Sequence, residues 1–123
     1  MKRLLLLAAM VVAPACSSDR PASVIDLDLH EFGISPSSEV FETGSVELRA
    51  VNSGQFAHTI VVTDASGEVV DASDLIAPDE RLTVTVDLDE GTYRISCRIV
   101  SSSPDGELFD HYELGMITDV HSG

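Results

Sequence analysis

The stretch "RLTVTVDL", Arg81–Leu88, alternates apolar and polar residues along its whole length. The apolar positions are Leu82, Val84, Val86 and Leu88. Successive side chains of a strand point to opposite faces, so an apolar residue at every second position is typical of a strand with one buried face. The stretch therefore predicts a half-buried β-strand.

The same alternation recurs along the chain. "VIDLDLHEF" at 24–32 and "TYRISC" at 92–97 repeat it, while 45–51 and 58–63 are rich in β-branched residues. Turn signals such as "ETGS", "NSGQ" and "APDE" separate these segments. No long amphipathic helix is evident, and the only helical turn we expect lies around 72–75. The pattern predicts an all-β sandwich or barrel.

The start of the chain has the composition of an export signal. Lys2 and Arg3 are basic, residues 4–13 are apolar, and "APA" directly before Cys16 offers small residues to a signal peptidase. The apolar run is shorter than the roughly 20 residues of a membrane-spanning helix. We therefore expect residues 1–15 to be a signal peptide.

A cysteine directly after such a signal resembles the lipidation site of bacterial lipoproteins. Cys16 therefore predicts a lipid anchor, with plain secretion after "APA" as the alternative. Residues 16–22 are mostly small and polar, which suits a flexible tether. The folded domain is expected at 23–123. The mature protein is expected on the extracytoplasmic side of the cell envelope, as a lipoprotein or else secreted or periplasmic.

The chain has 123 residues and a formal net charge of −14, and loss of Lys2 and Arg3 would make it more negative. Binding to nucleic acid is excluded, because no basic stripe exists to neutralise phosphates. An anionic membrane surface would repel the domain, so lipid at Cys16 is the only membrane contact expected. A cationic protein partner would be attracted, although the charge also serves solubility.

Four residues with metal-binding side chains stand out as candidate ligands of one site: His58, Cys97, His111 and Met116. One thiolate, two imidazoles and a weak axial thioether form the ligand set of a blue copper site. If Cys16 carries lipid, Cys97 is the one free thiol of an exported protein, and such a thiol is oxidised unless it is buried or bound to metal.

Each of the four also has an ordinary structural explanation. Cys97 shares a strand face with Tyr93 and Ile95, so it could be an inert core thiol. Either histidine could lie at a strand edge, and Met116 alone would be core filler. Two further histidines, His30 on the polar face of the first strand and His121 near the end, are assigned to solvent.

The order of the motifs resembles that of the cupredoxins, in particular the plastocyanin and azurin group. The matching stretches are "LHEFGISPSS", "VNSGQFAHTIVV", "IAPDERLTVTVDLDEGTYRISC" and "HYELGM", within residues 24–120. The resemblance implies a Greek-key β-sandwich, with one copper per chain held by His58, Cys97, His111 and Met116. It also implies that Thr59 hydrogen-bonds near the site and ties the ligand segments together.

One feature departs from that family. Thirteen residues, "RIVSSSPDGELFD", separate Cys97 from His111, where relatives usually have about two to four. "SPDGE" is a strong turn signal. A hairpin around Pro104–Gly106 would pair residues whose numbers add to 209 or 210 and return His111 almost opposite Cys97. A one-residue slip would turn a side chain to the other face, so the sequence leaves the geometry open.

Three functions remain open. The first is an exported electron-transfer protein, not an enzyme, that works with a redox partner protein and is expected to be a monomer. The second is a copper carrier without redox turnover. The third is a cupredoxin-like binding module without metal. No nucleophile motif of a hydrolase is present in the sequence.

Overall fold

The computed structural model of the protein describes residues 20–123. The expected signal peptide, 1–15, and Cys16 lie outside the described residues. Within 20–123 the first strand begins at Ser23, and no helix is long and apolar enough to cross a membrane.

The described residues form strands joined by turns. Their bounds are β1 (Ser23–His30), β2 (Gly33–Pro36), β3 (Val40–Phe41), β4 (Gly44–Asn52), β5 (Val61–Thr63), β6 (Val69–Ala72), β7 (Arg81–Leu88), β8 (Thr92–Ser96), β9 (Val100–Ser102), β10 (Leu108–Asp110) and β11 (Ile117–Ser122). The expected helical turn at 72–75 is absent. Ser73 instead pairs with Ile60 through both its backbone N–H and its hydroxyl, which holds this segment extended beside β5.

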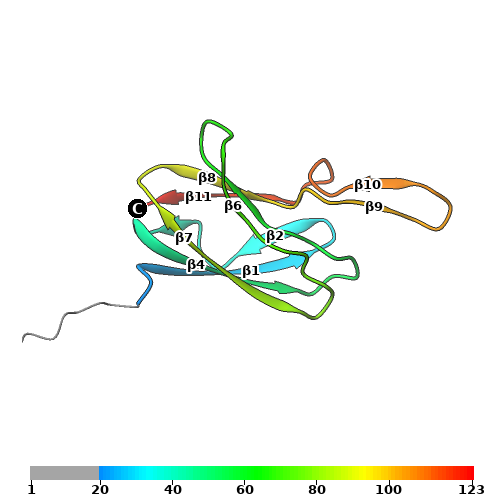
Figure 1. Ribbon diagram of the computed structural model, residues 1–123, viewed down its shortest axis with the longest axis horizontal. Helices are drawn as coiled ribbons and strands as arrows, with labels where there is room; N and C mark the ends of the chain where they lie inside the picture. The colour runs from blue at the N-terminus through cyan, green and yellow to red at the C-terminus, as the bar shows by residue number, and fades with distance from the viewer. Residues whose placement is uncertain (1–19) are drawn as a thin grey trace, which may run out of the picture.

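Two sheets pack face to face as a sandwich (Figure 1). One has the order β2-β1-β4-β7 and the other β3-β11-β8-β5-β6. The chain crosses repeatedly between them, which confirms the Greek-key β-sandwich. Most neighbouring strands pair antiparallel, but β1 pairs with β4 in parallel, and β11 with β3. The chain visits the other sheet at β3 before β4 returns beside β1, and such a crossover permits parallel pairing.

The apolar residues predicted to face inward in β1 and β7 are buried or half-buried in the structure. In β1, Ile25, Leu27 and Leu29 are buried and the residues between them are exposed. Strand β7 repeats this pattern, with its last three apolar positions fully or almost fully buried. The opposing sheet contributes Ile95 of β8 to the same core. The core therefore fills the space between the two sheets, and the loops at the ends of the strands are where a functional site can form.

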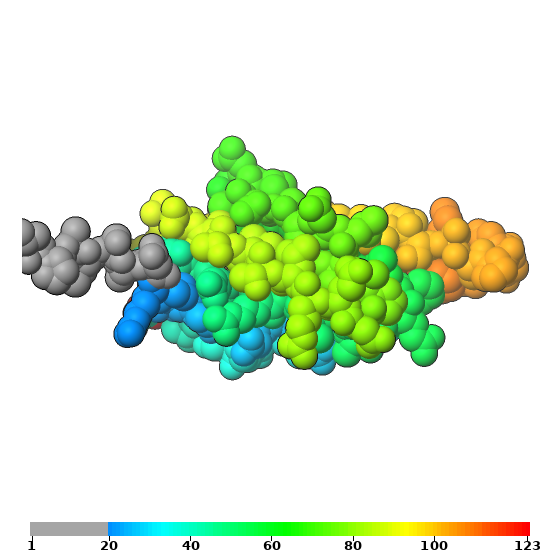
Figure 2. All heavy atoms as spheres, turned by 60° about the horizontal axis from the view of Figure 1, so that its bottom comes forward, coloured from blue at the N-terminus to red at the C-terminus, as the bar shows by residue number. Residues whose placement is uncertain are grey.

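The expected hairpin between Cys97 and His111 is present. Strands β9 and β10 pair with each other alone, with Ser101 opposite Phe109, so paired residue numbers add to 210, one of the two predicted values. Gly106 has a φ of 88° at the turn, a left-handed conformation that glycine adopts without strain. The hairpin extends beyond the sandwich at the end opposite the C-terminus (Figure 1), and Figure 2 shows it as a separate projection.

Candidate metal centre

Three candidate ligands come from three different segments. His58 precedes β5 and is held by two backbone hydrogen bonds with Ile76, of 3.0 and 2.8 Å. Cys97 follows the last residue of β8, and His111 follows the last residue of β10. The hairpin pairing continues to its base, where His111 N–H donates to the Ile99 carbonyl at 3.0 Å. The hairpin thus returns His111 to the end of β8.

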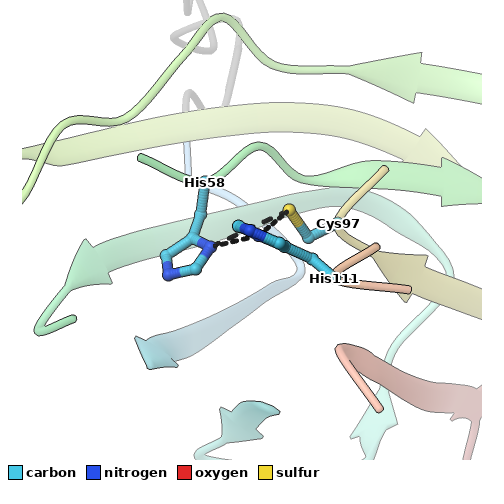
Figure 3. Close-up of side chains that lie close together, drawn as sticks. All are labelled: His58, Cys97 and His111. Atoms are coloured by element: carbon cyan, nitrogen blue, oxygen red, sulfur yellow. Dashed lines mark hydrogen bonds between the residues drawn. The ribbon is translucent and has the colours of Figure 1, made fainter. Parts of the chain in front are cut away.

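The three side chains point toward one another (Figure 3). The Nδ1 atoms of His58 and His111 are 3.1 Å apart, and the Cys97 Sγ lies 3.9 Å from the first and 3.6 Å from the second. All three residues are fully buried. Their donor atoms lie on a circle of radius about 2.1 Å, which matches the length of a metal–imidazole bond. The spacing therefore suits a single ion held by one sulfur and two nitrogens.

Met116 lies beside two of these residues. Its N–H donates to the His111 carbonyl at 3.0 Å, and its own carbonyl accepts from the Cys97 N–H at 3.1 Å. The Met116 side chain is fully buried. The short loop from 111 to 116 thus closes back on Cys97 and brings the thioether residue to the same end of the sandwich.

Each imidazole has a side-chain partner at its other nitrogen. His58 Nε2 is 3.3 Å from Oε1 of Glu31, and His111 Nε2 is 2.8 Å from the hydroxyl of Ser101 on β9. These contacts leave both Nδ1 atoms facing Cys97. An acceptor at one ring nitrogen fixes the proton there and frees the other nitrogen for a metal.

Sequence reasoning missed Glu31 and Ser101. Glu31 lies in the turn between β1 and β2, far from His58 in the chain, and no local pattern marks it as a partner. Ser101 lies on the inserted hairpin, and its observed pairing with Phe109 places it two residues from His111 across the ribbon. Only that pairing register could have identified Ser101 from the sequence.

Burial and charge shift the acid–base properties of the centre. Burial lowers the pKa of His58, and the nearby carboxylate of Glu31 only partly opposes this. Burial also lowers the pKa of His111, and His58 lowers it further. Partial burial raises the pKa of Glu31, but hydrogen bonds from Phe56 and Gln55 outweigh it and leave that pKa below its ordinary value. Near neutral pH the centre thus presents neutral imidazoles beside an ionised carboxylate.

Three phenylalanines, Phe32, Phe56 and Phe109, pack together and form an aromatic cap over the centre. Their ring centroids lie 6.1 to 6.4 Å apart. The His111 ring lies 4.9 Å from Phe32 and 6.0 Å from Phe56. Phe109 comes from the hairpin, so the insertion covers the site as well as returning a ligand. The cap keeps water from His111, which has no exposed surface.

Asn52 shapes the loop before His58. Its side-chain amide donates to the carbonyls of Phe56 and Ile76 at 2.8 Å each, and its oxygen accepts from the Gly54 N–H at 2.9 Å. The half-buried Thr59 was expected to make such a contact, but within 20–123 its hydroxyl forms no hydrogen bond. Its role stays a prediction.

The two histidines assigned to solvent are not part of the centre. His121 is exposed on β11, and His30 is half-buried with its Nε2 3.1 Å from the Ser35 hydroxyl. Neither belongs to the group of converging donors, which within the described residues consists of His58, Cys97 and His111.

The donor set fits copper, one ion per chain. Thiolate sulfur suits Cu(I), and imidazole is tolerated by both oxidation states. In residues 20–123 no buried side-chain nitrogen or oxygen lacks a hydrogen-bond partner, so the surroundings of the centre are already satisfied by the protein.

Comparison with solved structures finds the same fold in other proteins. The match with auracyanin from Roseiflexus castenholzii covers 83% of this chain and 97% of the auracyanin chain, at 17% identity and a TM-score of 0.59. The match with auracyanin A, a "blue" copper protein from Chloroflexus aurantiacus, covers 81% of this chain and 98% of the auracyanin A chain, at 16% identity and a TM-score of 0.59. The match with a purple cupredoxin from Nitrosopumilus maritimus covers 80% of this chain and 98% of the cupredoxin chain, at 17% identity and a TM-score of 0.52. These likenesses show the fold.

The family is shown by the sequence itself. No curated protein sequence matches the chain. A profile of the cupredoxin-like domain matches residues 3–109, which is most of the chain and includes His58 and Cys97. With its Greek-key sandwich and its converging thiol and imidazole donors, the chain belongs to the cupredoxin-like domain family.

Proposed function

We propose that the protein is an exported copper protein that transfers electrons through a mononuclear blue-copper-type site. Cys97, His58 and His111 would hold the ion, and Met116 would be a fourth, weaker ligand. The observation that carries the proposal is the convergence of two Nδ1 atoms and one Sγ within 3.9 Å of one another in a buried site. Met116 is buried, and its backbone is hydrogen-bonded to that of Cys97 and of His111, which supports Met116 as the fourth ligand.

The surroundings suit a site that changes oxidation state with little movement. A copper ion held here would take up and release one electron. The ligands come from the ends of paired strands, and backbone hydrogen bonds join their segments to each other and to Ile76. A site held in one geometry by its protein does not need to reorganise between Cu(I) and Cu(II), which keeps the barrier to electron transfer low.

Copper titration of the domain from residue 20 onward tests this function. We expect one Cu(II) per chain and an intense visible absorption band, because a Cu(II)–thiolate bond absorbs strongly by charge transfer. Cys97→Ser should abolish the band, while His121→Gln, at an exposed position, should leave it unchanged. Reversible bleaching and return of the band with copper retained would separate electron transfer from copper delivery. Failure to bind stoichiometric copper would contradict both and leave the metal-free module.

The partner follows from charge and location. A formal charge of −14 would attract a cationic redox protein, whose association should slow as salt is added. We propose that the protein acts as a monomeric carrier and not as an enzyme. Of its relatives, auracyanin A is a "blue" copper protein by its printed description.

We further propose that the mature chain begins at Cys16 and carries lipid there. The support is the export signal with "APA" directly before Cys16. Mass spectrometry of the mature protein from membranes should find a lipid-modified Cys16 at the N-terminus. An unmodified Cys16, or a mature chain that starts elsewhere, would contradict the anchor and favour plain secretion.

A further inference from the structure

We propose that Glu31 orients His58, fixes its tautomer and, through its negative charge, lowers the reduction potential of the copper site. This inference rests on the proposed function, since it takes His58 as a copper ligand. Glu31 acts as a positioning residue: it faces the imidazole and not the ion.

The carboxylate of Glu31 is itself held in place. Its Oε1 accepts hydrogen bonds from the backbone N–H groups of Gln55 and Phe56, at 2.7 Å each, and lies 3.3 Å from His58 Nε2. The loop 53–57 therefore wraps around this oxygen before the chain reaches His58. A carboxylate fixed by two charge-assisted bonds offers a rigid acceptor to the imidazole.

Gly54 gives independent support for this cradle. A Cβ atom added at Gly54 would overlap both oxygens and the carboxyl carbon of Glu31. The glycine in "NSGQ" thus leaves the space that the carboxylate fills. The loop before His58 is shaped around a side chain from the turn between β1 and β2, not only around its own backbone.

The contact decides which nitrogen of His58 can bind a metal. A neutral imidazole carries one N–H, and an acceptor at Nε2 keeps the proton there. Nδ1 is then unprotonated and faces Cys97 Sγ at 3.9 Å and His111 Nδ1 at 3.1 Å. Without Glu31, the tautomer with its proton on Nδ1 becomes populated, and that form cannot bind the ion through Nδ1.

The two imidazoles are held by unlike partners. Ser101, which bonds His111 Nε2, offers a neutral hydroxyl, whereas Glu31 offers a carboxylate whose Oε1 accepts two backbone N–H bonds. A carboxylate on the far nitrogen makes an imidazole a stronger donor. A stronger donor stabilises Cu(II) more than Cu(I), so the charge of Glu31 should lower the potential. The hydroxyl at His111 supplies no comparable effect.

The first experiment needs no copper. Nitrogen-15 NMR of the metal-free domain reports the tautomer of each histidine. In the wild type we expect His58 protonated at Nε2 only. Glu31→Gln should keep this tautomer, because the amide oxygen still accepts from Gln55, Phe56 and the imidazole. Glu31→Ala and Gly54→Ala should both give a mixture of tautomers, the first by removing the acceptor and the second by displacing it.

The second experiment measures copper. Glu31→Gln should weaken Cu(II) binding relative to Cu(I) about tenfold, which raises the one-electron potential by about 59 mV. Glu31→Ala should lower copper affinity by about 10- to 100-fold. Glu90→Gln is the matched control. It removes an exposed carboxylate that lies about 20 Å from Cys97, at the other end of β8, and it should leave the potential unchanged.

The outcomes separate this inference from the proposed function. A wild-type domain without the copper band would contradict the function, whatever the NMR shows. A wild type with the band, but with His58 in the same tautomer in all variants and an unchanged potential in Glu31→Gln, would overturn the role of Glu31. If Glu31→Ala does not fold, Glu31→Gln and Gly54→Ala decide the question.

Discussion

Single residues that are not ligands do much of the positioning at the metal centre. Asn52 joins the loop before His58 to the carbonyls of Phe56 and Ile76, and it is fully buried with its amide satisfied. Ser101 holds the far nitrogen of His111. Polar side chains of this kind are costly to bury unless all their hydrogen bonds are made. Their presence indicates that the loops are held in one geometry before a metal arrives.

Met116 is the residue whose proposed role is most specific to electron transfer. We expect Met116→Leu to keep copper and the visible band but to raise the reduction potential, because leucine removes an axial donor that stabilises Cu(II). Redox titration followed at the visible band measures this. Ile95→Val, another buried change on the strand that leads to Cys97, should leave the potential in place. An unchanged potential in Met116→Leu would mean that Met116 is core filler.

At the scale of elements, the β9–β10 hairpin explains how a long insertion is compatible with a compact site. The pairing begins with Val100 opposite Asp110 and continues outward, so the chain leaves the sandwich along β9 and returns along β10 in register. The base of the hairpin carries the functional contacts, namely Ser101 to His111 and Phe109 in the aromatic cap. The hydrogen bonds made by residues 103–107 at the tip stay within the hairpin, so the length of the tip should matter little to the metal.

A shortened hairpin tests this division. Replacing residues 103–107 by Asn-Gly would connect the paired residues Ser102 and Leu108 through a two-residue turn. We expect copper affinity and the visible band to be retained. Ser101→Ala in the full-length hairpin should instead lower copper affinity about tenfold, because His111 loses its orienting partner. Isothermal titration with Cu(II) compares the two. Loss of copper in the shortened form would place part of the site in the tip.

At the scale of the whole molecule, acidic side chains and two buried imidazoles both lose their stabilising effect as the pH falls, but over different pH ranges. The carboxylates of Asp64, Asp105 and Asp119 each have a pKa below the ordinary value, the first two through hydrogen bonds from serine hydroxyls and the third through Arg94. Their stabilising effect is lost only when the pH falls below the ordinary range of an aspartate. The histidines respond at higher pH.

Metal-free protein should therefore lose stability in two steps as the pH falls. Burial holds the pKa of His58 and of His111 below the ordinary value of about 6.5. Below that pH the unfolded chain binds more protons than the native chain, so the free energy of unfolding decreases from about pH 6.5 downward, above the range in which the three aspartates lose their effect. Urea denaturation with a chelator at pH 7.0 and 5.5 measures the first step. Equal free energies at the two values would contradict it.

The sequence alone determined the class of the fold and the order of the candidate ligands. Alternating apolar residues in 24–32 and 81–88 predicted half-buried strands, because burial of one sheet face has the same period as the side chains themselves. The turn signal around Pro104–Gly106 predicted the hairpin and narrowed its register to two choices, of which the structure has the one that pairs Ser101 with Phe109. These features are local, so a local pattern can carry them.

Only the tertiary structure decided the rest. The parallel pairing of β1 with β4 depends on how the chain crosses between sheets, and no strand pattern encodes it. The convergence of His58, Cys97 and His111 depends on three loops meeting at one end of the sandwich. Glu31 reaches His58 from the other sheet, across 27 positions of chain. Contacts between segments far apart in sequence arise from packing, so the charge beside one imidazole became visible only in the folded molecule.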